Sequence, residues 1–366
     1  MKLAWRELTR RPSRFVTAGA ALTLIVLLLL ALGGILDALV QSSTGLLKAQ
    51  TAPLIVYSAD SKGSIDRSRV TAEDRAAVEA VPGVHDASGL GLALLAGYLP
   101  GHTEPSNVAV FGYEAANLRV PAPPQPGEGY ADRSLETDGL AIGETVELGT
   151  ARIPVKVVGW VQDTNYNLQS GLWVDAATWR RALNANIPDA AVAPGTFQAI
   201  LVTPEESTTP AQLETAIDAA VPAVNALTIP QAIAGIPGVA EQDSVFTSII
   251  GVTFAVAGIV VALFFALLTI ERVGLLGVLK AIGASSRTLA AGLTLQAILI
   301  AGGAIVLGSL LAVALAQVIP DAVPLTLTVG RFVFTAVGLI VAALIGSAIS
   351  FRRIIRIDPA SAVGGA

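Results

Sequence analysis

The 366-residue sequence contains no cysteine, so it can form neither a disulfide framework nor a thiolate metal site. Charged residues are also scarce, at 14% of the chain, whereas a soluble domain carries about a quarter. Three motifs are missing: the G-x-x-x-x-G-K-S/T loop that cradles nucleotide phosphates, the H-E-x-x-H metal motif and the G-x-S-x-G nucleophile motif. The sequence therefore offers no standard means of binding a nucleoside triphosphate and no recognised hydrolytic centre.

Candidate ligands for a metal or a cofactor are few. The only histidines, His85 and His102, lie near glycines, where a surface or loop position is the simplest interpretation. Catalytic carboxylate pairs stay open at this level, although the many acids are most simply a solvated face. Gln296 is the clearest polar residue in an apolar block, and such a residue more often joins helices than contacts a substrate. We predict no catalytic residue, no metal and no cofactor bound by this chain.

The sequence is instead rich in apolar residues, which make up 53% of it and gather in four long blocks. Crossing a hydrocarbon core takes roughly 20 apolar residues. The blocks predict four transmembrane helices, at residues 15–36, 245–270, 288–319 and 332–351. The first block could instead be a cleaved secretory signal, but a signal has an apolar region of only about 7–15 residues, and no clear cleavage site follows here. The near absence of ionisable groups in the blocks argues against a carrier driven by protons or ions.

The basic residues predict the orientation of the chain. Segments 1–14, 271–287 and 352–366 are rich in lysine and arginine, whereas the long stretch 37–244 is acidic. Because cytoplasmic loops accumulate lysine and arginine, we expect both termini and residues 271–287 inside, with 37–244 and a short loop at 320–331 outside. This separation of charge gives nucleic-acid binding no support.

Residues 1–14 are predicted to be a cytoplasmic amphipathic segment. Trp5 can sit at headgroup depth while the neighbouring Arg6, Arg10 and Arg11 face anionic lipid. A plain basic flank without helical structure is the alternative, and the sequence leaves both open.

The predicted outer segment 37–244 combines strands and helices. Apolar runs at 53–57 and 197–202 predict strands. Each is followed by a helical pattern, at 71–81 and 210–220, and we expect these strand–helix units to form one α/β subdomain from both ends of the segment. A β-rich subdomain is predicted to be inserted in it, from short strand candidates at 108–113, 145–148, 153–160 and 171–175. The predicted fold class is an α-helical membrane protein with four transmembrane helices and an extracytoplasmic α+β domain.

The most informative segment is the predicted inner loop 271–287, with the sequence E-R-V-G-L-L-G-V-L-K-A-I-G-A-S-S-R. Residues 273–282 have the pattern of a short, mostly apolar helix that is too short to cross a membrane. Such a helix must bury its apolar side in lipid headgroups or in a partner protein. The residues alone leave these two interpretations open.

This loop resembles the signature of the MacB/FtsX-type permeases of ABC transporters, which runs approximately E-R-x-x-E-I-G-V-L-K-A-I-G-A-S. The residues that match are Glu271, Arg272, Gly277, Val278, Leu279, Lys280, Ala281, Ile282, Gly283, Ala284 and Ser285. Gly274, Leu275 and Leu276 depart from it, and Leu275 replaces a glutamate that could make a salt bridge to the ATPase. The tail R-I-D-P-A at 356–360 is similar to the family's closing R-I-D-P-x-x-A-L, and residues 142–149 more weakly resemble the β-rich part of a MacB-like outer domain.

The resemblance implies a permease subunit whose ATPase is a separate chain. Two copies of the permease would pair and dock on an ATPase homodimer, which would bind the ATP and Mg. The loop would act as a coupling helix that passes the closure of the ATPase to the outer domain, a mechanism called mechanotransmission. Lipid would surround the spans in a bacterial cell (inner) membrane, and an extracytoplasmic partner is also expected in part of the family. The residues expected to couple to the ATPase are Glu271, Arg272, Gly274, Leu275, Gly277, Val278, Leu279, Lys280, Ala281, Gly283, Ala284 and Ser285.

Several functions stay open within this family. Export of an amphipathic or hydrophobic compound, such as a peptide, an antibiotic, a lipid or haem, is the leading hypothesis. The alternative is an FtsX-like regulator that transmits force to an extracellular cell-wall hydrolase without moving a substrate. A membrane-anchored binding or adhesion protein would require the loop resemblance to be accidental. The sequence names neither the substrate nor the residues that contact it, and no haem ligand can be assigned.

Overall fold

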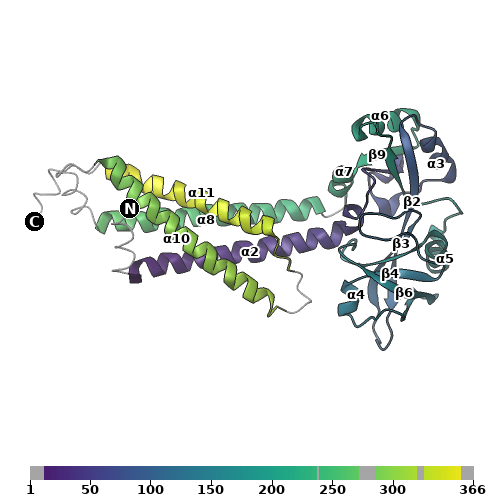
Figure 1. The fold of residues 1–366 in the computed structure, drawn as a ribbon, viewed down its shortest axis with the longest axis horizontal. Coiled ribbons are helices and arrows are strands. Elements are labelled where there is room, and N and C mark those ends of the chain that lie inside the picture. The colour runs from purple at the N-terminus through teal and green to yellow at the C-terminus, as the bar shows by residue number, and fades with distance from the viewer. Residues whose placement is uncertain (1–11, 237–238, 272–284, 320–324, 356–366) are drawn as a thin grey trace, which may run out of the picture. The chain divides into compact units, whose positions relative to one another are not determined.

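The computed structural model describes residues 12–236, 239–271, 285–319 and 325–355 (Figure 1). The chain divides into two compact units, one made of residues 1–38 and 243–366 and the other of residues 39–242. We call them the helical unit and the sheet unit. Helix α2 contributes to both, because it runs without interruption from Pro12 to Lys48.

Among its described residues, the helical unit has four helices that are long and apolar enough to cross a membrane, as the sequence predicts. Their bounds are Pro12–Lys48 for α2, Val239–Glu271 for α8, Ser286–Ala316 for α10 and Val329–Ile355 for α11. Helices that carry apolar side chains on most of their surface are typical of membrane spans. Figure 1 shows α2 and α10 running in one direction, and α8 and α11 in the opposite direction.

Small residues let these helices approach closely. A Cβ atom on Gly308 of α10 would lie only 2.6 Å from the Cβ of Val26 on α2. A Cβ on Gly346 of α11 would lie 2.7 Å from the carbonyl oxygen of Gly258 on α8. Close backbone approach through small residues is a common source of helix packing in lipid, where burial of apolar surface gives little advantage.

The sheet unit is built on nine strands in the order β3-β7-β4-β6-β5-β2-β8-β1-β9. Strand β3 also pairs with β2, so β2, β3, β7, β4, β6 and β5 close into a ring, while β2, β8, β1 and β9 form an antiparallel sheet. The strands are β1 (Leu54–Ser58), β2 (Val84–Tyr98), β3 (Ser106–Tyr113), β4 (Glu128–Asp132), β5 (Thr145–Leu148), β6 (Ile153–Val161), β7 (Ser170–Asp175), β8 (Ala199–Pro204) and β9 (Val224–Thr228).

The α/β subdomain forms from both ends of the segment, as predicted. Strand β1 pairs with β8 on one side and β9 on the other, although the 140 residues from 59 to 198 separate β1 from β8. Apolar side chains of helices α3 (Ala72–Glu79) and α6 (Pro210–Ala220), such as Val78 and Leu213, share a buried cluster with these strands. Thr71 caps α3 and exchanges hydrogen bonds with Asp74, which explains where this helix begins.

The β-rich part is present, but it is not separated from the α/β sheet. Strand β2 is 15 residues long and belongs to both, because it pairs with β3 and β5 along one part and with β8 along another. The sequence did not predict this strand, and it also missed β4, β9 and helix α5 (Ala176–Asn186). The described part of the sheet unit also contains the α-helices α4 (Ser134–Thr137) and α7 (Ile229–Ala234).

Candidate functional site

The predicted coupling residues lie between two long helices. Glu271 is the last residue of α8, and Ser285 directly precedes α10. The other coupling residues, Arg272, Gly274, Leu275, Gly277, Val278, Leu279, Lys280, Ala281, Gly283 and Ala284, lie outside the described residues. The segment therefore joins α8 to α10 at the end of the helical unit where α2 begins and α11 ends (Figure 1).

An ion pair joins α2 to α11 at the opposite end of the helical unit. Arg331 Nε lies 3.1 Å from Asp37 Oδ2, and its guanidinium also donates to Oδ1, so the contact is bidentate. The two side chains are only 14% and 27% exposed. Thr328 Oγ1 accepts a hydrogen bond from Arg331 N and lies 3.3 Å from Asp37 Oδ2, which ties the start of α11 to the same carboxylate.

Two glycines make room for this contact. A Cβ atom on Gly33 would lie 2.6 Å from Arg331 Cδ, and one on Gly34 would lie 2.9 Å from Thr326 O. Thr326 N in turn donates to Gly34 O at 3.1 Å. The segment before α11 is therefore held against α2 by backbone contact as well as by charge. Sequence reasoning missed this pair, because Asp37 and Arg331 fell just outside the predicted spans; two lone opposite charges at neighbouring span ends were the signal.

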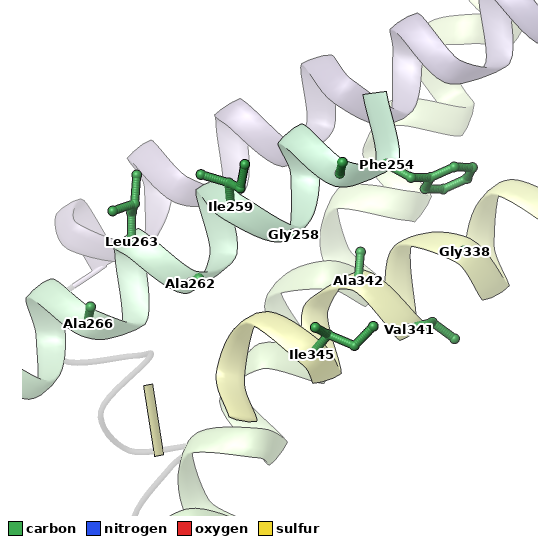
Figure 2. A pocket seen from close by; sticks show the side chains of 11 residues that line it. Phe254, Gly258, Ile259, Ala262, Leu263, Ala266, Gly338, Val341, Ala342 and Ile345 are labelled. Atoms are coloured by element: carbon green, nitrogen blue, oxygen red, sulfur yellow. The ribbon is translucent and has the colours of Figure 1, made fainter. Parts of the chain in front are cut away.

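Two apolar grooves lie between the helices. One, of about 630 Å³, lies between α8 and α11 and is lined by residues such as Phe254, Gly258, Leu263 and Val341 (Figure 2). The other, of about 660 Å³, lies between α2 and α10. The described residues that line the grooves include no charged side chain and no histidine. Such surfaces can hold acyl chains, an apolar ligand or another helix, and they cannot perform acid–base chemistry.

The structure also places the other polar residues singled out from the sequence, the two histidines and Gln296. His85 on β2 and His102 in the turn after it are both exposed, which agrees with a surface position. Gln296 is 4% exposed on α10, so it lies in the packed interior of the helical unit. Among the residues that the structure describes, no group of three or more histidine or acidic side chains could hold a metal ion.

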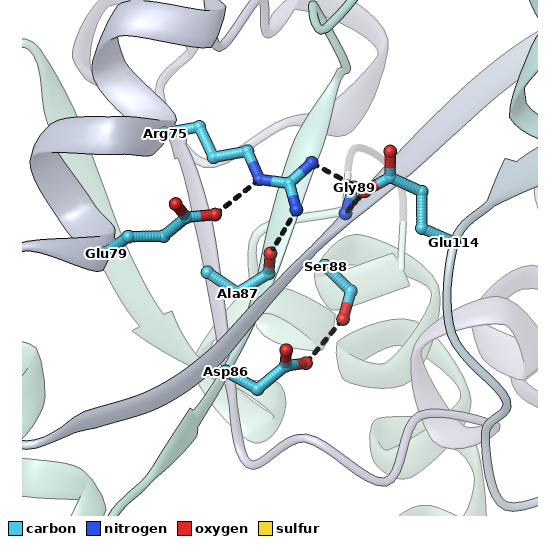
Figure 3. Close-up of polar contacts among 7 residues, drawn as sticks. All are labelled: Arg75, Glu79, Asp86, Ala87, Ser88, Gly89 and Glu114. Atoms are coloured by element: carbon cyan, nitrogen blue, oxygen red, sulfur yellow. Dashed lines mark hydrogen bonds and ion pairs between the residues drawn. The ribbon is translucent and has the colours of Figure 1, made fainter.

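A polar cluster on the sheet unit ties α3 to β2 (Figure 3). Arg75 donates to Glu79 Oε1 at 2.8 Å, to Glu114 Oε2 at 2.6 Å and to the carbonyl oxygen of Ala87 at 2.7 Å. Glu114 Oε2 also accepts from Gly89 N at 2.8 Å. Partial burial opposes the charge on Arg75, but the hydrogen bonds to the two glutamates raise its pKa above the ordinary value. The donors and acceptors satisfy each other, which is the pattern of a structural contact rather than a reactive centre.

Comparison with known proteins gives one family. Residues 247–359 match the model of the FtsX-like permease C-terminal family. The uncharacterized ABC transporter permease Rv0072 of Mycobacterium tuberculosis is 31% identical over 308 residues, which cover 80% of this chain and 78% of that protein.

Two further similarities cover a smaller part of this chain. The "Putative hemin transport system permease protein HrtB" of Staphylococcus epidermidis is 30% identical over 126 residues, which are 34% of this chain and only 36% of that protein. The crystal structure of the periplasmic region of MacB from Actinobacillus actinomycetemcomitans is similar with a TM-score of 0.35 and 11% identity, over 52% of this chain and 94% of that one.

Proposed function

Because the chain belongs to the FtsX-like family of ABC transporter permeases, we propose that it couples ATP hydrolysis by a separate ATPase to motion of the sheet unit, and thereby exports an amphipathic or hydrophobic compound. The observation that carries the proposal is the loop sequence between α8 and α10, which matches the coupling signature in a chain that lacks a phosphate loop. The ATPase binds ATP and Mg, and this chain supplies the docking surface.

The proposed topology places both termini and the coupling segment in the bacterial cytoplasm and the sheet unit outside the membrane. The direction of the four helices supports it, because α2 begins, α8 ends, α10 begins and α11 ends at one end of the helical unit (Figure 1). The basic residues gather in the segments that adjoin this end, including Arg352 and Arg353 on α11. A membrane-impermeant maleimide should therefore label Ile142→Cys, but not Lys280→Cys, in intact cells, and the lack of native cysteine makes the background negligible.

The chemistry of the grooves supports an apolar or amphipathic cargo. Their lining consists of aliphatic side chains, one phenylalanine, glycines and a single threonine, Thr23, and it offers no fixed charge that would select an ion. Peptides, antibiotics, lipids and haem all have apolar surface of a size that such grooves accept. The hemin named for HrtB concerns a protein of which only about a third is matched, so haem stands here as one candidate among these.

Docking on the ATPase is tested by co-purifying the chain with its ATPase and measuring ATP turnover. Val278→Asp puts a charge on the apolar face that we propose to fill a groove of the ATPase, so we expect loss of co-purification and of turnover in the complex. Ile142→Asp makes a comparable change at a side chain that is 57% exposed on the sheet unit, and it should leave both unchanged. Gly277→Arg provides a second variant, since a bulky side chain would hold the helix away from the groove. Wild-type binding and turnover in both loop variants would refute the docking site.

The regulator alternative is separated from export by a different readout. A permease that only transmits force should co-purify a cell-wall hydrolase through the sheet unit, and its deletion should alter cell-wall turnover without changing sensitivity to apolar compounds. An exporter should show the reverse. Two copies of this chain pair on the ATPase homodimer in either case.

A further inference from the structure

The end of α2 is bound directly by the loop that joins β6 to β7, residues 162–169. Leu46 N donates to Asn165 O at 3.0 Å, and Leu168 N donates to Ser42 O at 3.1 Å. The helix and the loop therefore exchange backbone hydrogen bonds in both directions within the sheet unit. Such an exchange between a helix and a loop over 100 residues away fixes the position of one relative to the other more firmly than side-chain contact does.

The contact is also too close for any side chain at position 45. A Cβ atom on Gly45 would lie 2.7 Å from Asp163 O and 2.8 Å from both the N and the O of Asn165. These are backbone atoms, which cannot rotate away as a flexible side chain would. The side chains of Gln41 and Arg119 both donate to the same carbonyl of Asp163, at 3.3 Å and 3.0 Å.

The loop itself has an unfavourable backbone conformation. Asp163, Asn167 and Leu168 have φ angles of 57°, 49° and 61°, in the left-handed region. Aspartate and asparagine adopt this conformation as single residues, whereas it is unfavourable for leucine. Leu168 gains no burial from this conformation, because its side chain is 54% exposed. Its N–H reaches Ser42 O instead. A strained loop that persists in this way must be held by its surroundings, and here α2 is one of them.

The other side of the loop is anchored in the ring of strands. Both the N–H and the hydroxyl of Thr164 donate to Asp132 Oδ2 at 2.8 Å, and Asp132, at the end of β4, is only 3% exposed. Its other oxygen accepts from the N–H and the hydroxyl of Ser134, at 3.1 Å and 3.0 Å. Tyr166, which is 1% exposed, donates its hydroxyl to Asp66 at 3.0 Å. The loop is thus bonded to α2 on one side and to the strand ends on the other.

The geometry points to a transmission joint: movement of the first span enters the sheet unit through the β6–β7 loop, with Gly45 and Asp132 as its positioning residues. This inference rests on the proposed function, because it names the part that carries the motion. An intact α-helix moves as a stiff element, so displacement of α2 displaces residues 42–46. The loop must follow them. The hydrogen bond from Thr164 to Asp132 passes the displacement to β4, and the hydrogen bond from Gly171 N to Asn165 Oδ1 passes it to β7.

The experiment measures this motion in the full chain bound to its ATPase. Two cysteines are introduced, at Ile142 in the sheet unit and Val318 in the helical unit, which are 57% and 81% exposed. Spin labels on them report the distance between the two units by pulsed electron resonance, without nucleotide and with ATP trapped by vanadate. Dilution with unlabelled chain removes contributions between copies.

Two variants loosen the joint: Gly45→Ala acts on the side of α2, and Asp132→Asn acts on the side of β4. Each has a matched control, Gly251→Ala for the first and Asp189→Asn for the second. No atom lies within 4 Å of a Cβ on Gly251, and Asp189 is exposed. We expect the wild type and the controls to change distance on trapping, and both joint variants to keep ATPase binding and turnover but lose most of that change. If both joint variants bind the ATPase and still change distance as the wild type does, the joint is refuted. If the wild type shows no change at all, the proposed function fails and the joint with it.

Discussion

Replacing Asp132 with asparagine tests how the buried carboxylate holds the β6–β7 loop. Each of its two oxygens accepts from one backbone N–H and one hydroxyl, which belong to Thr164 and Ser134. Asparagine keeps one oxygen and puts an NH2 group in place of the other. If that oxygen stays with Thr164, the Ser134 hydroxyl can turn to accept, but the Ser134 N–H is left facing another donor.

The expected loss of stability follows from the hydrogen bonds that Asp132→Asn removes at this buried position. A hydrogen bond to a charged group contributes about 1.5–3 kcal/mol, and a stranded buried N–H costs about 1–3 kcal/mol. We therefore expect Asp132→Asn to lower the free energy of unfolding by about 3 kcal/mol. In a domain of about 200 residues this corresponds to a fall of about 6–12 °C in the unfolding temperature.

The assay is thermal unfolding of the full chain in detergent, followed by tryptophan fluorescence. Of the four tryptophans, Trp160, Trp173 and Trp179 belong to the sheet unit, so the signal reports that unit. Asp189→Asn removes the same charge at an exposed position and should leave the midpoint within about 1 °C, as most surface substitutions do. Equal midpoints for the two variants would refute the reasoning, because a buried acceptor of four hydrogen bonds would then contribute nothing.

Three further outcomes are expected. Arg331→Ala should lower the unfolding temperature of the full chain more than the double variant with Asp37→Ala does, because the single change leaves a partly buried carboxylate without its partner. Equal effects would show that the unpaired carboxylate carries no cost. Gly308→Leu should push α10 from α2 and increase aggregation in size-exclusion chromatography, whereas Gly292→Leu, where a Cβ meets nothing within 4 Å, should not. Burial raises the pKa of Tyr166, so the folded state holds the phenol proton more tightly than the unfolded chain does. The contribution of Tyr166 to stability should therefore be complete below about pH 10 and fall as the pH rises above that value. Tyr166→Phe should flatten this fall in a pH series of unfolding midpoints.

Local signals in the sequence were sufficient for the parts of the fold that depend on local physics. The four spans follow from the length of their apolar runs, because lipid requires each to satisfy its own backbone. Helix α6 was predicted with its observed bounds, Pro210–Ala220. In the structure Thr209 caps this helix and its first residue is a proline, so local features fix where it begins. Strand β5 was also found at its observed bounds, Thr145–Leu148, as a short β candidate between turns.

Strand β2 shows what the local pattern could not predict. Its sequence is rich in glycine and alanine, which favour strands poorly, yet it is the strand that links the two parts of the sheet unit. Gly91 and Gly89 are required there because the rings of Trp179 and Phe197 occupy the space that a Cβ would need. These rings stack with centroids 5.6 Å apart and come from α5 and the chain before β8. Partners distant in sequence therefore make this segment a strand.

The candidate sites divide in the same way. The coupling segment was predicted from residues that follow one another in the chain, and its helical structure and docking stay predictions. The Asp37–Arg331 pair joins residues 294 positions apart, and the joint brings Ser42 and Leu46 to a loop that follows more than 100 residues later. The sequence by itself determined the four long apolar helices and the motif between the second and third of them, because apolar length and a contiguous motif are local properties. Only the tertiary structure decided which charges meet and where α2 is held, because those contacts depend on how distant segments pack.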